Sequence, residues 1–574
     1  MSTILTTKFR IHNAESFKEG FNETELTNVY TAIGKITPWS PNDKNLGGLS
    51  TSSDTNIPDP IDSMQSDFEV WRNMISLKKI QPSDVSHVIP RVNWAEGKVY
   101  SMYKDDDTTL FNDYTNQPFY VMTDEFKVYK CLFNNNDQIT TLAGKPTQTI
   151  TTPFETSDKY VWKYMYTVSS ADAFKFMTEN YIPVKKILSN PGSGCSAETS
   201  QWDVQDAAVD GAIEYVYRHF SETGTGGAGS NYVHLVGNLN GEGSIISTNQ
   251  FILNSGVATN DYYKGATIYF PSPGEGLAPV SFLISGYDGS TNKVTITLPA
   301  GETDVATLVI KNNADFEILP TVKVDGDGTG FEAVAVMESV NSGTIDKIKI
   351  LKQGTGYTKA TVSFVNSSLP FSSGGPPSPI DATFSVVISP RGGHGSDAVR
   401  ELGGFFIMLN TKFNYNESGI PTANDFRQIS LIRNPSVYDN SQLATSNIYN
   451  QTKTLVLRQP DGSPDFVTDD IIVQEESGDE LARAVVVDVK IVGNFKHVRI
   501  TNITGTFETF ASGSSGTLTA PIVDGGSGAT TDLLDSILNE DLKPYSGDVL
   551  FVEQRRPIER DNSQIEDIKI VLEF

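Results

Sequence analysis

One string of the sequence places histidine, serine and carboxylate side chains close together, GGHGSDAVRELGG at 392–404. His394, Ser396 and Asp397 are the residue types of a nucleophilic triad, in which histidine takes the proton of a serine hydroxyl and a carboxylate orients the histidine. The members of such a triad converge from separate elements, whereas these three are near neighbours on one glycine-rich stretch. We therefore interpret 392–404 as a connecting segment that leads back into the core, and we predict no catalytic residue there.

Two other glycine-rich strings have the spacing of ligand-binding loops. GTGGAG at 224–229 satisfies G-x-G-x-x-G, but a predicted strand, SNYVHLV, follows it where a dinucleotide site needs a helix. DGDGTG at 325–330 offers two carboxylates, fewer than a calcium-binding EF-hand loop requires. We interpret both strings as turns and predict no cofactor-binding residue.

The sequence contains no pattern of metal ligands. Its six histidines are scattered without H-E-x-x-H or H-x-H spacing, and neither C-x-x-C nor the G-K-[ST] of a phosphate-binding loop occurs. A pair of carboxylates that cleaves a glycan would leave no such pattern, because its two members need only meet in space. With that alternative left open, we predict no metal site and no enzymatic activity.

Charge and composition narrow the classes of partner. Lys+Arg 44 against Asp+Glu 70 gives a net charge of −26, which disfavours binding to nucleic acid and to anionic membranes. Two cysteines, Cys131 and Cys195, imply no disulfide framework. The first residues form no signal-peptide core, and no apolar run reaches the ~18 residues of a membrane helix. We expect a chain of several domains that folds in a cytoplasm and binds neither nucleic acid nor membrane.

Three arginines near the C-terminus stand out in this acidic chain. Arg555, Arg556 and Arg560 lie between two predicted strands. One interpretation is a solvated turn. The other is a salt-bridged contact with an acidic partner or a second subunit, a setting in which arginine is favoured. We keep these three residues as candidate interface residues.

Alternating residues predict the strands of the core. At 160–168, large aromatic rings alternate along one face, which is typical of a half-buried strand; a sugar-binding platform is the weaker alternative. Residues 548–554 are apolar on both faces, which predicts a strand buried on both sides. Residues 568–574 form a last alternating strand. These two C-terminal strands are expected to close a sheet built from distant parts of the chain.

Helical spacing predicts three short helices. The first is capped by Asn13 and continues at helical spacing as far as Gly34, which stops it. The second carries Phe68 and Trp71, and the third lies behind Thr531. The apolar residues that define these helices are Phe17, Phe21, Leu26, Val29, Tyr30 and Ile33; Phe68, Trp71, Met74 and Ile75; and Leu533, Leu534, Ile537 and Leu538.

A series of segments resembles one known family. They are TTKFR near the start, GKITPWSPN (34–42), SHVIPRVNWAEGKVY (86–100), VYKCL (128–132), DKYVWKYMYTV (158–168), ENYIPV (179–184), more weakly TSQWDVQDAAVDGAIEYVYR (199–218), then FRQISLIRNP (426–435) and the tail DVLFVEQRRPIERDNSQIEDIKIVLEF (548–574). In the same order and at comparable spacing, they are similar to stretches of the gene-product-eight family of baseplate wedge proteins from T-even-type contractile-tailed phages.

The stretches without this resemblance divide the chain. They are rich in glycine and short β-type runs, and loops tolerate such insertions at small entropic cost. We expect a mainly β (α+β), multi-domain fold: a mixed β-sheet core with a few short helices, interrupted by two glycine-rich modules resembling β-sandwiches or barrels. The predicted parts are 1–218, the N-terminal part of the core; 219–400, an inserted glycine-rich β domain; 401–440, a continuation of the core; 441–543, a second inserted β module; and 544–574, the core-closing strands.

The resemblance implies a function in the virion. It implies a structural subunit of the tail baseplate wedge, assembled in the host cytoplasm, that forms a homodimer and binds the equivalents of gene products six, seven and ten. It also implies rearrangement when the tail sheath contracts, with no cofactor. Two alternatives stay open. One is a glycan-degrading enzyme, and the other is a tail adhesin that binds host-surface glycan through exposed aromatic rings of the first insert, such as Tyr262, Tyr263, Tyr269 and Phe270.

Overall fold

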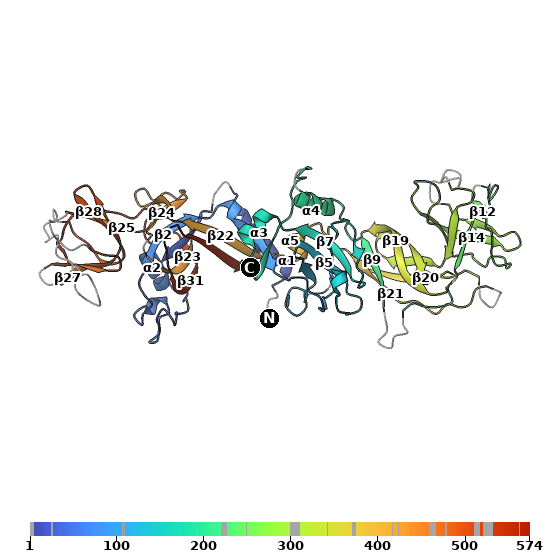
Figure 1. Cartoon of the computed structure of the whole chain (residues 1–574), viewed down its shortest axis with the longest axis horizontal. Helices are drawn as coiled ribbons and strands as arrows, with labels where there is room; N and C mark the ends of the chain where they lie inside the picture. Colours follow the sequence, from blue (N-terminus) through green and yellow to red (C-terminus); the bar gives the residue numbers. More distant parts are fainter. Residues whose placement is uncertain are drawn as a thin grey trace. The chain divides into compact units, whose positions relative to one another are not determined.

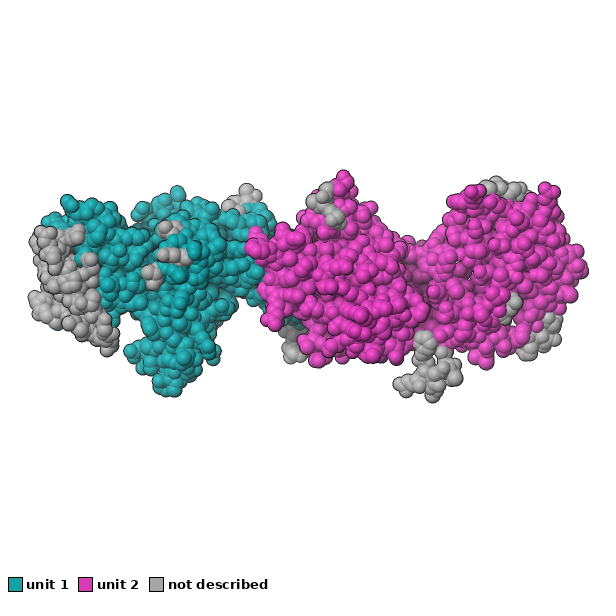
Figure 2. Space-filling model, in the orientation of Figure 1, with its two compact units in different colours: residues 1–88, 405–574 teal, residues 89–404 magenta. Residues whose placement is uncertain are grey.

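The chain folds into two compact units, seen here in a computed structural model. Unit 1 comprises residues 1–88 and 405–574, and unit 2 comprises residues 89–404; Figure 2 colours them separately. Unit 1 is thus assembled from both ends of the sequence. The structure describes residues 5–574 except 24–26, 106, 108, 194–195, 220–226, 248, 299–309, 341, 370–374, 416, 423, 459–465, 477–478, 510–516, 520–531 and 562.

The main sheet of unit 1 has five strands, and all neighbouring pairs are antiparallel (Figure 1). Its central strand, β1, is buried along its whole length because apolar clusters cover both faces of the sheet. The order is β24 (Ile448–Asn450), β2 (Met74–Lys79), β1 (Val29–Gly34), β23 (Phe426–Arg433) and β31 (Asp548–Ile558).

The first predicted helix is shorter than expected. α1 spans Thr7–Glu19 and is capped by Thr6, not Asn13. Val29, Tyr30 and Ile33 belong to β1, and Leu26 lies outside the described residues. The prediction of a helix there was wrong because β1 is buried on both faces, so apolar residues fill most of its positions and also satisfy helical spacing. The second helix, α2 (Met64–Asn73), is confirmed, although Met74 and Ile75 begin β2.

A second sheet of unit 1 contains β32 (Ile565–Glu573), β22 (Phe406–Asn414) and β3 (Val85–Pro90). β32 pairs with β22 over nine residues, and α1 packs nearby, with the rings of Phe17 and Phe574 5.2 Å apart. The last two strands of the chain therefore do not pair with each other. β31 lies at the edge of the five-stranded sheet, and Leu550 on it is exposed, so the prediction of burial on both sides of 548–554 was wrong.

A closed barrel lies between β24 and β31 in the sequence. Its interior is filled by side chains such as Leu455, Val486, Val498 and Leu534. The predicted helix at 533–538 is instead β30, which closes the barrel by pairing with β25. In barrel order the strands are β25 (Lys453–Arg458), β28 (Phe495–Gly505), β27 (Asp479–Val492), β26 (Ile471–Glu476), β29 (Thr517–Thr519) and β30 (Asp532–Leu538).

Unit 2 contains a four-stranded sheet of mostly buried strands. Trp162, Tyr164 and Tyr166 on its inner strand β7 (Val161–Thr167) are buried, as is Tyr160 just before the strand. This confirms the core interpretation of the aromatic series. The other strands of this sheet are β4 (Tyr120–Met122), β5 (Lys127–Phe133) and β6 (Phe154–Glu155). Unit 2 also contains β8 (Tyr181–Val184) and the paired strands β9 (Ile213–Arg218) and β21 (Phe384–Ile388).

Two further antiparallel sheets of unit 2 lie between β9 and β21 in the sequence. The four-stranded sheet has the order β19 (Ile345–Thr355), β18 (Thr329–Met337), β17 (Thr321–Gly326), β20 (Ala360–Val365). The seven-stranded sheet has the order β10 (Leu235–Asn238), β16 (Asp315–Leu319), β13 (Thr267–Phe270), β14 (Val280–Asp288), β15 (Lys293–Ile296), β12 (Gln250–Ile252), β11 (Ile245–Ser247). The mainly β, multi-domain fold class predicted from the sequence is confirmed.

The helices are few and short. Within the described ranges, none is both long and apolar enough to cross a membrane. Besides α1 and α2, the described residues include α3 (Ser170–Phe176), α4 (Ser196–Asp206) and α5 (Ala398–Glu401), with single 3-10 turns at Lys44–Leu46, Pro82–Asp84, Leu142–Gly144 and Glu417–Gly419.

Candidate interaction surface

The segment 392–404 connects β21 to β22, as predicted, and its histidine is sealed inside unit 2. The His394 Nδ1 atom lies 2.7 Å from Lys130 Nζ, and Lys130 also pairs with the carboxylate of Glu401. Asp397 caps α5 instead of orienting the histidine. Among the described residues, no hydrogen bond joins His394 to Ser396 or Asp397. The three residues do not form a triad.

Glu401 organises this buried network. Its carboxylate accepts hydrogen bonds from the backbone N–H groups of Gly395 (2.8 Å) and Asp397 (3.2 Å) as well as from Lys130. Burial alone would raise the pKa of Glu401, but the charge of Lys130 and the contact with His394 lower this pKa to about 2. The carboxylate is therefore ionised and paired in a site without solvent, which suits a structural role in holding α5 on β5.

The remaining chemical motifs also have structural roles. DGDGTG forms the turn between β17 and β18, and the Asp327 carboxylate accepts hydrogen bonds from Thr358 and Lys359. The first half of GTGGAG, at 224–226, lies outside the described residues. Within the part of the chain that the structure describes, no three His, Cys, Asp or Glu side chains gather as metal ligands would.

The aromatic rings suggested for glycan binding are mostly core residues. Tyr263, Tyr269 and Phe270 are buried, and Tyr262 packs on Tyr263 with ring centroids 5.0 Å apart. The expectation that these rings are exposed was wrong for the three buried ones. Tyr269 and Phe270 lie on β13, an inner strand of the seven-stranded sheet that is buried along its length, and Tyr263 packs in the same apolar core as Phe270. The three buried rings therefore offer no stacking surface to a sugar.

The three candidate arginines have different surroundings. Arg560 is buried, donates to the carbonyl of Pro421 and lies 3.2 Å from Glu566, so its guanidinium cannot reach a partner. Arg555 is exposed and pairs with Glu553 at 2.6 Å. Arg556 is exposed and makes no ion pair with any described residue. The interface prediction therefore stays with Arg555 and Arg556.

Arg555 and Arg556 lie on β31, where Pro557 follows them. Proline and charged side chains on an edge strand prevent its backbone from pairing with another chain. The loop after β1 covers part of the same strand: Trp39 Nε1 donates to the carbonyl of Arg555 at 2.8 Å, and Gln554 Nε2 donates to the carbonyl of Leu46 at 2.9 Å. A partner would therefore contact this surface through side chains and not by adding a strand.

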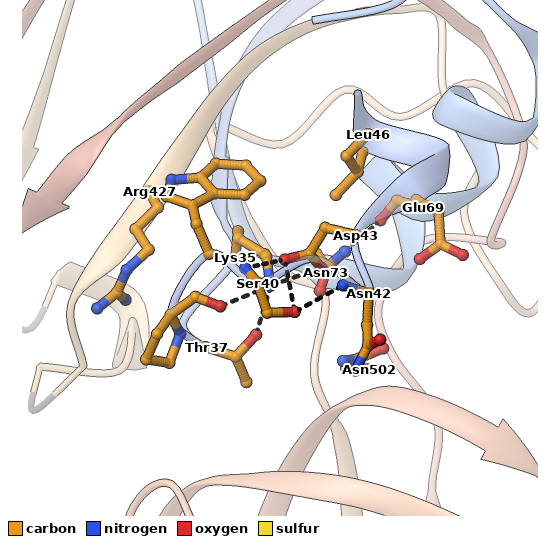
Figure 3. A network of polar contacts seen from close by, with 12 residues as sticks. Lys35, Thr37, Ser40, Asn42, Asp43, Leu46, Glu69, Asn73, Arg427 and Asn502 are labelled. Atoms are coloured by element: carbon orange, nitrogen blue, oxygen red, sulfur yellow. Dashed lines mark hydrogen bonds and ion pairs between the residues drawn. The ribbon is translucent and has the colours of Figure 1, made fainter. Parts of the chain in front are cut away.

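The loop after β1 is held by a buried lysine (Figure 3). Lys35 Nζ lies 3.1 Å from the Asp43 carboxylate and donates to the hydroxyl of Thr37 at 2.7 Å, while Asp43 also accepts from the backbone of Ser40. The backbone N–H of Lys35 donates to the carbonyl of Asn73, at the end of α2. Burial lowers the pKa of Lys35, and the Asp43 carboxylate opposes this shift.

A second ion pair fixes the middle of the loop. Arg427 on β23 donates through two nitrogens to the carboxylate of Asp54, at 2.9 and 3.0 Å, and through a third to the carbonyl of Ile36. The hydrogen bonds from Arg427 lower the pKa of Asp54. Bidentate pairing of this kind fixes geometry as well as charge. The string GKITPWSPN contains Lys35 and Trp39, but nothing in the sequence identified Asp43, Asp54 or Arg427 as their partners.

These contacts of Lys35, Trp39 and Arg427 hold the loop after β1 on the sheet. The same part of the chain carries the similarity to known proteins. The family model described as Bacteriophage T4, Gp8 matches residues 3–146. The baseplate wedge protein gp8 of Enterobacteria phage T4 is 26% identical over 211 residues, which are 32% of this chain and 60% of that relative. The chain thus matches less than two thirds of the relative's length. These matches confirm the resemblance predicted from the sequence segments.

Proposed function

Because the chain is related to the gene-product-eight family of baseplate wedge proteins, we propose that it is a structural subunit of a phage tail baseplate. In this proposal it assembles in the host cytoplasm and resides in the virion. It forms a homodimer and connects neighbouring wedge proteins, the equivalents of gene products six, seven and ten, during assembly and sheath contraction. It has no enzymatic role and requires no cofactor. The match over residues 3–146 is the observation that carries the proposal.

The contacts that hold the loop after β1, within the matched segment, support an assembly role. A surface that is ordered before it binds loses little conformational entropy on association. Lys35, Trp39 and Asp54 hold the loop after β1 through contacts to residues of β23, β31 and the loop itself. Arg556, exposed and unpaired within the described chain, adds a cation on the same strand that the loop covers, where an acidic partner could bind.

Light scattering on the purified chain tests this function. We expect a particle of about twice the 62.6 kDa chain mass that forms a defined complex when mixed with candidate wedge proteins of the same phage. A monomer that joins none of these proteins, or a trimer of the kind that fibres form, would contradict the proposal.

A further inference from the structure

Four large side chains with apolar surface are exposed on α2, just before it or in contact with it. They are Ile61 (42% exposed), Met64 (74%), Phe68 (45%) and Tyr545 (51%), and we call them the α2 patch. Met64 and Phe68 are four residues apart on α2 and so lie on the same face of the helix. The rings of Phe68 and Tyr545 are 4.7 Å apart and nearly perpendicular. Apolar surface gathered in this way marks a contact site more often than scattered exposed residues do.

Carboxylate side chains lie next to the residues of the α2 patch in the sequence, both just before α2 and on the helix itself. Asp59 and Asp62 are exposed beside Ile61, and Asp67 precedes Phe68. No ion pair neutralises these three within the described residues, whereas Glu69 pairs with Arg72 at 3.4 Å. Burial, and then the charge of Asp62, raise the pKa of Asp67, so the carboxylates are close enough to repel each other. The surface is therefore both apolar and negatively charged.

The patch is also fixed in place. On the other side of α2, Val70 is buried in the core of unit 1, and Trp71 is buried as well. Ser63 caps the helix by accepting from the N–H of Ser66 at 3.1 Å. The segment before α2 packs against Gly47, where a side chain would collide with the carbonyl of Asp59. Apolar side chains held exposed on a fixed frame lose little entropy on binding, so this surface is suited to association.

We propose that the α2 patch docks a partner protein through a segment that presents apolar side chains flanked by lysine or arginine. The inference rests on the proposed assembly function and adds the surface and the partner's chemistry. Charge complementarity selects this occupant, since a basic segment gains from carboxylates that have no cation of their own. A second copy docked through the same patch would place these carboxylates against each other, which disfavours a symmetric dimer through this surface.

A peptide probe tests the chemistry of the surface. The probe is an amphipathic helical peptide with leucine on one face and lysine on the other, and its counterpart with glutamate in place of lysine is the control. In fluorescence anisotropy with the full chain, we expect the lysine peptide to bind and the glutamate peptide to fail. Met64→Ser/Phe68→Ser is expected to weaken binding about tenfold or more, because the apolar contact is lost.

Two further variants locate the binding. Asp59→Lys/Asp62→Lys changes exposed positions and leaves the core intact. We expect it to weaken binding of the lysine peptide about as strongly as Met64→Ser/Phe68→Ser does. Leu142→Ser/Leu188→Ser, which removes exposed leucines from unit 2, is expected to change nothing. Equal binding of the lysine peptide to the wild-type chain and to both patch variants would overturn the proposal, since the peptide would then bind elsewhere on an acidic protein.

Assembly with candidate wedge proteins separates this inference from the proposed function. If the wild-type chain forms the complex and Met64→Ser/Phe68→Ser remains folded but does not, the docking site is supported. If both form it equally, the docking site is overturned and the proposed function stands. If the wild-type chain forms no complex, the proposed function fails, and the peptide measurement alone decides the chemistry of the patch.

Discussion

The indole of Trp39 donates a hydrogen bond to the main-chain carbonyl of Arg555 at 2.8 Å, joining the loop after β1 to the edge strand β31. The two residues are 516 positions apart in the sequence. Each lies in a segment that resembles the wedge family, GKITPWSPN and the C-terminal tail. The contact shows that these distant segments lie against each other in unit 1.

Replacing Trp39 should destabilise unit 1 through loss of its hydrogen bond and, in a separate variant, through loss of its buried ring as well. Trp39→Phe removes the indole N–H and leaves the Arg555 carbonyl without that donor, at a cost of about 1 kcal/mol. Trp39→Ala also empties a buried site and should cost about 3–5 kcal/mol. Urea unfolding followed by circular dichroism measures both. A Trp39→Phe variant as stable as the wild type would show that the hydrogen bond contributes nothing.

Breaking the buried pair of Lys130 and Glu401 should be costly. Glu401→Gln leaves the ammonium of Lys130 buried without its counter-charge, for which we expect a loss of about 3–5 kcal/mol. The exposed pair of Lys352 and Glu332 is the matched control, and Glu332→Gln should cost about 1 kcal/mol or less. The free energy of unfolding of each variant, measured by urea titration and compared with that of the wild type, tests this expectation. Equal losses in the two variants would contradict a structural role for the buried network.

Acid should destabilise unit 2 in two stages. Burial, and then the charge of Lys130, lower the pKa of His394, so the folded protein keeps this ring neutral while the unfolded chain takes up a proton below its ordinary pKa of 6.5. Stability is thus lost as the pH falls below about 6.5, with a slope of up to about 1.4 kcal/mol per pH unit for one proton. Glu401 acts at lower pH, since its stabilising charge is present above 4.5 and is lost as the pH falls toward about 2.

A histidine variant separates these stages. Burial lowers the pKa of His234 as well, so acid sensitivity below pH 6.5 has a second source of the same sign. His394→Gln should reduce the slope of stability against pH between about 6.5 and 5, whereas a loss below 4.5 should remain because Lys130 still pairs with Glu401. Unfolding free energies measured across this range test the assignment. An unchanged slope in His394→Gln would contradict it.

Two C-terminal arginines should have different roles: Arg556 in complex formation and Arg560 in the stability of the fold. Arg556→Glu reverses an exposed charge and should weaken complex formation while changing stability by less than about 0.5 kcal/mol. Arg560→Met leaves Glu566 buried without its cation and should cost about 3–5 kcal/mol. Thermal unfolding and light scattering on both variants give the two readouts. Normal complex formation by Arg556→Glu would remove this residue from the interface.

The sequence predicted strands where the local pattern matches the final environment. Alternating rings at 160–168 became the buried strand β7, as the core interpretation predicted, but both faces of β7 are buried where a half-buried strand was expected. At 29–34 and 533–538, apolar spacing predicted helices, yet β1 and β30 formed. β1 pairs with β2 and β23, and β30 pairs with β25 as well as with the nearby β29. Because β2, β23 and β25 lie far away in the sequence, pairing with them leaves no local signal.

The polar networks were even less predictable. His394 could be identified from its string, but its real partners, Lys130 and Glu401, come from β5 and α5. Likewise, the sequence suggested an interface of three arginines, and only the fold places Arg560 beside Glu566 in the interior. Ion pairs are set by tertiary distance, so a sequence pattern gives the candidates but not the pairing.

Labelling of intact virions tests the central claim most directly. An antibody raised against the purified chain, applied to particles of the phage that encodes it and viewed by electron microscopy with gold, should mark the base of the tail. Label on the head or the distal fibres, or particles that carry no copy of the chain, would contradict a structural role in the baseplate.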